Sequence, residues 1–229
     1  MNNQHLVHFE RSQRVTTLID SQPEDFPEGS KAAALCTSIK QEQARLAELD
    51  VIRSSSMSKR KQATAARNNA HRLLEPLVKR VIDTAEGFVS EHPDTEGMFV
   101  RPQKNASDQT LIADARSIAD KAASLVGLFT EDGLPPTFVS DMRTYADSIE
   151  RSIQLQTESV GERLHANAEM KEVIRRLKEL IERLDIIVRN KYVNQPAKLA
   201  AWESARRLEH PARSNGNAEN NAPPPAPPQ

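Results

Sequence analysis

Residues 170–188 read MKEVIRRLKELIERLDIIV, and the spacing of their apolar positions decides the fold class. These positions recur at alternating steps of four and three residues: Met170, Ile174, Leu177, Ile181, Leu184 and Val188. Such a repeat is typical of the seam of an antiparallel helical bundle or a coiled coil. The apolar pattern extends back to Phe138, so the sequence predicts one long helix over about 137–191. If unbroken, this helix spans about 80 Å at ~1.5 Å per residue.

The same periodicity predicts four further helices, and no sustained two-residue alternation indicates a strand. They cover about 3–21, 30–90, 107–130 and 196–208. Ser54–Ser56 and Pro76 weaken the helix over 30–90, and Gly161 weakens the helix over 137–191, so the sequence leaves open whether the two long helices are continuous. We predict an all-α fold, an elongated antiparallel helical bundle with two long helices, two shorter helices and a short C-terminal helix.

The composition changes near the C-terminus. The helical bundle is predicted to occupy residues 1–210, and residues 211–229 consist mostly of Asn, Ala, Pro and Gln. Such a composition cannot bury enough apolar surface to form a packed core. We therefore predict that residues 211–229 form a disordered, proline-rich tail.

The two halves of the bundle follow a similar plan. Each has a short helix, a proline-containing acidic loop and a long helix, in that order. A shift of 103 residues aligns Leu35 with Phe138 and Ala63 with Ala166. Residues 1–92 and 107–195 are therefore candidate repeats of an internal duplication, although periodic helices also match by chance.

The composition also limits the function of the chain. Of 229 residues, 38% are hydrophobic and 4% aromatic, which suffices for apolar stripes on helices but not for a large compact core. The net charge of −1 gives no whole-chain attraction to nucleic acid or to an anionic membrane. No stretch approaches the roughly 18 apolar residues of a membrane span, and no secretory signal is recognised. We expect a cytoplasmic protein, and its single cysteine, Cys36, excludes an intramolecular disulfide.

No arrangement of residues in the sequence indicates catalysis. Phosphate-binding glycine loops and a nucleophile elbow are absent. Glu162 and His165 have the Glu-x-x-His spacing of di-iron bundles, but such sites need a second copy and two more glutamates. His5 and His8 lack a third metal ligand nearby. We therefore expect no enzyme activity, no metal and no cofactor. Packing or surface roles are expected for two other candidates, His71 and Cys36.

The strongest local anomaly is a change of charge near residue 81. Residues 57–81 contain seven basic side chains and one acid, whereas residues 82–100 contain five acids and no Lys or Arg. Five of the basic residues are candidates for contact with nucleic acid phosphates: Lys59, Arg60, Lys61, Arg67 and Arg72. No aromatic residue is interleaved to stack on bases. We therefore favour a face that pairs with acidic residues of a neighbouring helix or is simply solvated.

Two segments resemble known proteins. Residues 184–207 read LDIIVRNKYVNQPAKLAAWESARR, and the sequence Gly133-Leu134-Pro135-Pro136 leads into the long helix. Both features resemble a group of uncharacterised bacterial all-helical proteins, the first of them in their C-terminal part. The resemblance implies an all-helical fold and a bacterial origin, and it implies no activity, cofactor or site residue.

Three functions are weighed, of which a metal-dependent bundle enzyme is the least favoured. The favoured one is a non-catalytic structural or protein–protein interaction module, which binds a protein partner or associates with itself through its apolar stripes. The alternative is a nucleic-acid-associated protein that binds through residues 57–81. A membrane partner is not expected.

Overall fold

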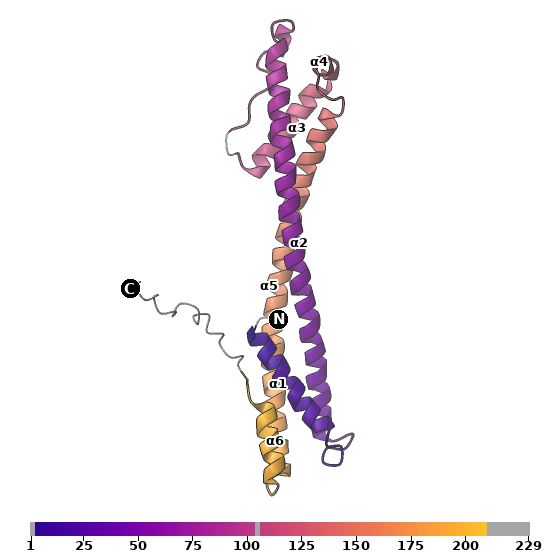
Figure 1. Cartoon of the computed structure of the whole chain (residues 1–229), viewed down its shortest axis with the longest axis vertical. Coiled ribbons are helices and arrows are strands. Elements are labelled where there is room, and N and C mark those ends of the chain that lie inside the picture. Colours follow the sequence, from indigo (N-terminus) through magenta and orange to yellow (C-terminus); the bar gives the residue numbers. More distant parts are fainter. Residues whose placement is uncertain (1–2, 104–105, 210–229) are drawn as a thin grey trace, which may run out of the picture. The chain divides into compact units, whose positions relative to one another are not determined.

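The computed structural model describes residues 3–103 and 106–209, and all regular elements among them are helices (Figure 1). In chain order they are α1 (Asn3–Asp20), α2 (Lys31–Phe88), the short 3-10 helix η1 (Pro93–Thr95), α3 (Asp108–Ala123), α4 (Val126–Glu131), α5 (Phe138–Lys191) and α6 (Pro196–Arg206). The predicted all-α class is confirmed. None of the helices in the described part of the chain has a stretch long and apolar enough to cross a bilayer. The tail predicted at 211–229 lies outside the described residues.

Both long helices are continuous. Helix α2 runs for 58 residues through Ser54–Ser56 and Pro76, and α5 runs for 54 residues through Gly161. Proline removes one intrahelical hydrogen bond and leaves the carbonyl four positions earlier without its usual donor. Because Pro76 and Arg72 are both exposed, water can hydrate that carbonyl, and the helix continues.

The prediction of a single helix over 107–130 is wrong, because the structure has two helices there. Helix α3 ends at Ala123, and α4 begins at Val126. The Ser124 hydroxyl donates to the Lys121 carbonyl oxygen at 3.1 Å, and the Leu125 N–H donates to the Ala122 carbonyl oxygen at 3.0 Å. Serine hydroxyls compete in this way with the helical hydrogen-bond pattern.

The long helices contribute to two compact units, which we describe separately. Among the described residues, unit 1 combines 3–50 with 168–209, and unit 2 covers 51–103 and 106–167. Each unit takes part of both long helices, so the units do not coincide with the candidate repeats 1–92 and 107–195. Both loops that precede the long helices contain a glycine with positive φ, Gly29 (85°) and Gly133 (86°), where a side chain would be strained. The duplication stays a prediction.

Unit 2 is built around a cluster of aromatic rings. Phe129 of α4 is fully buried, and its ring centroid lies 5.1 Å from that of Phe88 and 5.1 Å from that of Phe138. The ring of Phe99 approaches Phe129 edge-on at 5.6 Å. Apolar residues of α2, α3 and α5 complete this core. Helix α4 therefore fixes one end of the unit by inserting Phe129 between the ends of the long helices.

Unit 1 is closed by α6, which packs on α1. Trp202 of α6 is fully buried, whereas Leu208 remains 38% exposed. Tyr192 is also buried, and its hydroxyl donates to Asp25 at 2.9 Å. Hydrogen bonds from Lys198 and Tyr192 hold the pKa of Asp25 below its usual value. These contacts tie the loop after α1 to the end of α5.

In part of unit 2, α2 and α5 pack through small side chains. The buried residues there recur every seven positions on each helix: Ser56, Ala63 and Ala70 on α2, and Ser152, Ser159 and Ala166 on α5. Small residues at an interface allow two helix backbones to approach closely. A heptad spacing keeps them on the same face. This seam contributes no large apolar side chain, so the larger side chains beside it stay partly exposed.

Candidate interaction groove

The five basic residues singled out in the sequence all lie on α2 in unit 2, where the structure divides them into two groups. Lys59 contacts Glu162 of α5 at 3.2 Å, and Arg67 contacts Asp108 of α3 through two nitrogens at 2.7 and 2.9 Å. The remaining three have no acidic partner among the described residues: Arg60, Lys61 and Arg72. Pairing with acidic residues of neighbouring helices therefore accounts for Lys59 and Arg67 but not for the others.

Two of the unpaired residues, Arg60 and Lys61, line a groove between α2 and α5. The groove has a volume of about 330 Å³. It is lined by Ser56, Met57, Arg60, Lys61 and Thr64 of α2 and by Ser159 and Arg163 of α5. We call these seven residues the cationic groove. Its floor is the seam of small residues, because Ser56 and Ser159 are buried there.

The third cation of the groove, Arg163, comes from α5 and was not identified in the sequence. Its Nε is buried and has no hydrogen-bond partner among the described residues. Leaving a buried donor without a partner costs about 1–3 kcal/mol. The Arg163 side chain also lines the groove, so its positive charge would attract an anion there. The sequence gives no sign of this role, because Arg163 follows Glu162 in an ordinary charged stretch of α5.

The groove also contains apolar and neutral polar groups. The Met57 side chain is 43% exposed at its edge. The Thr64 hydroxyl donates to the Arg60 carbonyl oxygen at 2.9 Å and accepts a long hydrogen bond from the Gln156 amide at 3.3 Å. None of the seven described lining residues is a carboxylate, and the nearby Glu162, which accepts from Ser56, is paired with Lys59. The arrangement suits a ligand that carries negative charge and an apolar group.

Helix α3 is held against α2 by Asp108, which contacts α2 on the side of the groove toward Phe88. Besides the Arg67 contacts, Asp108 Oδ1 lies 2.8 Å from His71 Nε2, and Glu75 lies 3.2 Å from His71 Nδ1. Both ring nitrogens of His71 thus contact a carboxylate. Burial raises the pKa of Asp108, but hydrogen bonds from Arg67 and His71 outweigh it and hold this pKa below its usual value.

The Asp108 contacts predict an acid-sensitive contribution to stability. Because the pKa of Asp108 is lower in the folded chain than in the unfolded one, the contribution is present above about pH 4 and is lost as the pH falls through the folded pKa. The difference in free energy of unfolding between the wild type and Asp108→Asn, measured by urea denaturation, should therefore be largest at neutral pH and shrink in acid. Asp114→Asn on the same helix is the control. A difference for Asp108→Asn that is equal at pH 7 and in acid would contradict this role.

The metal-ligand spacing noted in the sequence has a structural role here. Glu162 accepts hydrogen bonds from the Ser56 hydroxyl at 2.7 Å and from Lys59 at 3.2 Å, and these bonds lower its pKa. Among the described residues, no group of three or more His, Cys, Asp or Glu side chains is arranged to hold a metal ion. Cys36 is buried in unit 1, and burial raises the pKa of its thiol to about 11, so the thiolate is disfavoured at neutral pH.

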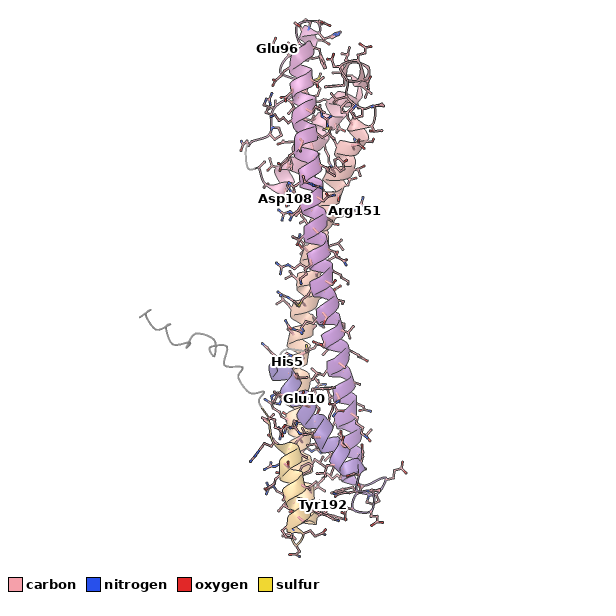
Figure 2. The ribbon with its side chains drawn as sticks, in the orientation of Figure 1. His5, Glu10, Glu96, Asp108, Arg151 and Tyr192 are labelled. Atoms are coloured by element: carbon pink, nitrogen blue, oxygen red, sulfur yellow. The ribbon has the colours of Figure 1, made fainter. Side chains whose placement is uncertain are left out.

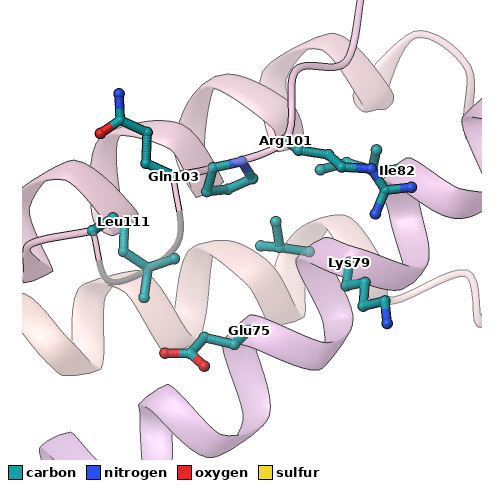
Figure 3. Close-up of a pocket in the computed structure, with 9 residues that line it drawn as sticks. Glu75, Lys79, Ile82, Arg101, Gln103 and Leu111 are labelled. Carbon is teal, nitrogen blue, oxygen red and sulfur yellow. The ribbon is translucent and has the colours of Figure 1, made fainter.

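A second cavity of unit 2 lies beneath the loop that follows η1 (Figure 3). Its volume is about 450 Å³, and its wall combines Val78, Ile82 and Leu111 with the charged groups of Glu75 and Lys79. Arg101, also in the wall, contacts Asp83 at 2.6 Å and Glu86 at 2.8 Å, which fastens the loop to α2. The described residues that line this cavity include no Ser, Thr or Cys.

The chain was compared with known proteins. No match was found among protein-family models, among curated protein sequences or among solved structures. The resemblance of residues 184–207 therefore gains no support from these comparisons, and the bacterial origin that it implies stays a prediction.

Proposed function

We propose that this chain is a non-catalytic protein-interaction module whose cationic groove binds an acidic segment of a protein. The observation that carries the proposal is the set of three cations, Arg60, Lys61 and Arg163, which line one groove without a carboxylate. Like charges gathered in this way repel one another, and an acidic partner relieves that repulsion. The exposed Met57 side chain adds an apolar contact of the kind found in protein interfaces.

The packing of unit 2 supports an interaction role. Where α2 and α5 pack through small residues, large apolar side chains of both helices stay exposed: Val51 (68%), Met57 (43%), Leu155 (47%) and Leu164 (58%). Single exposed apolar residues are common on proteins, so we take the cations of the groove as the decisive feature.

A direct test uses an acidic peptide as the probe. We expect a fluorescein-labelled 20-residue peptide rich in Glu and Asp, with leucines at helical spacing, to bind at low salt. The double variant Arg60→Glu/Lys61→Glu should weaken this binding about tenfold, because exposed ion pairs contribute up to about 1 kcal/mol each. Fluorescence anisotropy measures the affinity, and added salt should weaken it through screening.

A matched control separates the groove from general charge. Arg72→Glu/Arg80→Glu makes the same change in net charge on exposed positions of α2 outside the groove. The peptide affinity should then change much less than in Arg60→Glu/Lys61→Glu. Equal losses in the two variants, or no binding to the wild type at low salt, would refute the groove as the site.

Binding of nucleic acid phosphates is the second candidate, because Arg60, Lys61 and Arg72 have no acidic partner among the described residues. Neither wall of the groove contributes a Phe, Tyr or Trp to stack on bases, which favours the peptide. A 20-nucleotide single strand and a 20-base-pair duplex serve as competitors in the same assay. Nucleic acid that displaces the peptide at a lower concentration than unlabelled peptide does would favour this second function instead.

A further inference from the structure

We propose that the acidic segment bound by the cationic groove is provided by a second copy of this chain. The proposal rests on the function proposed above and names its partner. The surface that we assign to this contact lies at the end of unit 2, where α2 and α4 terminate and Phe88 packs against Phe129. Five exposed carboxylates form it, and we call them the acidic tip: Glu91, Asp94, Glu96, Glu131 and Asp132.

The acidic tip, like the cationic groove, carries charged side chains of one sign. None of its five carboxylates has an ion pair with a described residue. Helix α2 ends beside it with no basic residue in its last turn, and the C-terminal end of a helix carries a partial negative charge of its own. Carboxylates beside such an end are unfavourable unless a cation approaches them. Among the described residues, the tip carboxylates have no cationic partner and the three groove cations have no carboxylate partner, since Glu162 beside the groove pairs with Lys59 and Lys121 near the tip donates to the Met98 carbonyl oxygen.

The tip presents its carboxylates on an ordered turn. Asp94 lies within η1, where the Thr95 hydroxyl donates to the His92 carbonyl oxygen at 2.7 Å and Thr95 itself is buried. The His92 ring packs edge-on against Phe88, with 6.2 Å between the ring centroids. Glu96 follows directly beside the end of α2 (Figure 2). Because the backbone is already held, little conformational entropy is lost when the carboxylates are bound.

Within one chain the tip cannot reach its own groove. Arg60 and Phe88 lie on the same continuous helix, 28 positions apart, which corresponds to about 40 Å at ~1.5 Å per residue. The contact must therefore join two molecules. Groove against groove would bring like charges together, so the expected contact joins the tip of one copy to the groove of the other.

The proposal predicts association that depends on concentration and salt. We expect sedimentation velocity and light scattering at low salt to give a weight-average mass that rises above the monomer mass of 25.6 kDa with increasing concentration. Loading concentrations up to about 1 mM are needed, because exposed ion pairs are individually weak. At about 0.5 M salt the mass should return to that of the monomer, since screening shortens the range of these interactions.

Charge reversal identifies the two surfaces. The groove variant Arg60→Glu/Lys61→Glu and the tip variant Asp94→Lys/Glu96→Lys should each self-associate about tenfold more weakly than the wild type. Mixing the two variants should restore association, because the unchanged groove of one then meets the unchanged tip of the other. The control variants Arg72→Glu/Arg80→Glu and Glu24→Lys/Glu28→Lys make the same changes in charge elsewhere on the exposed surface and should behave as the wild type does.

The outcomes separate this inference from the proposed function. A wild type that stays monomeric at low salt, or a mixture of the variants that does not associate, overturns the second copy as the partner. If the acidic peptide still binds the groove in that case, the proposed function stands with another acidic protein as its partner. If neither the peptide nor a second copy binds, both are overturned. Circular dichroism of each variant confirms that a loss of association does not come from unfolding.

Discussion

Replacing Phe129 with alanine should lower the free energy of unfolding by about 3–5 kcal/mol, the usual range for removing a buried phenylalanine. The Phe129 side chain is fully buried and contacts the rings of Phe88, Phe99 and Phe138. Its removal leaves a cavity and three rings without their common partner, and each aromatic pair contributes about 0.5–1.5 kcal/mol beyond its buried area. Urea denaturation followed by circular dichroism measures the loss.

Two controls make this prediction specific. Leu155→Ala removes a 47% exposed side chain of the same unit and should change the free energy of unfolding by less than about 1 kcal/mol. The conservative Phe129→Leu should lose less than Phe129→Ala, because it keeps much of the apolar volume. A loss below about 1 kcal/mol for Phe129→Ala would show that α4 does not hold the end of unit 2.

The sequence is informative about the long helices because their apolar spacing and their helical period agree over many turns. Met170, Ile174 and Leu177 on α5 occupy the buried face that their spacing predicts. The break between α3 and α4 was missed because the apolar spacing continues through Ser124 and Leu125. Only the local hydrogen bonds of Ser124 and Leu125 reveal the turn.

The sequence identifies only some of the cations that line the cationic groove. Composition alone marks Arg60 and Lys61, which lie close together in one basic stretch. Lys59 and Arg67 are neutralised by ion pairs with Glu162 and Asp108, and these two acids lie far from them in the sequence. Finding Arg163 requires the antiparallel register of α2 against α5, which side-chain periodicity does not define. The proposed site therefore depends on a helix register that the sequence alone does not define.

Replacing Trp202 with alanine should have a similarly large effect on unit 1, about 3–5 kcal/mol. Trp202 is fully buried, and its indole Nε1 donates to Asp185 Oδ1 at 2.7 Å. The same carboxylate accepts from Arg189 at 3.0 Å and from Arg206 at 3.2 Å, so it connects α5 with α6. Without the indole, α6 loses its main apolar anchor, and Asp185 loses the one uncharged donor in this set of three.

Packing and hydrogen bonding at Trp202 can be separated by a second variant. Trp202→Phe keeps an aromatic ring but removes the donor to Asp185, so its loss should be smaller, about 1–3 kcal/mol for the lost charge-assisted hydrogen bond. If the two variants lose equal amounts, the hydrogen bond rather than the packing holds α6.

Val193→Ala, at a site that is 71% exposed in the same unit, should change the free energy of unfolding by less than about 0.5 kcal/mol. Trp202→Ala and Trp202→Phe lack the only tryptophan of the chain, so tryptophan fluorescence cannot follow their unfolding and circular dichroism is used instead. A loss below about 1 kcal/mol for Trp202→Ala would mean that α6 is held mainly by ion pairs, which join Arg189 with Glu203, Lys198 with Asp25 and Arg206 with Asp185.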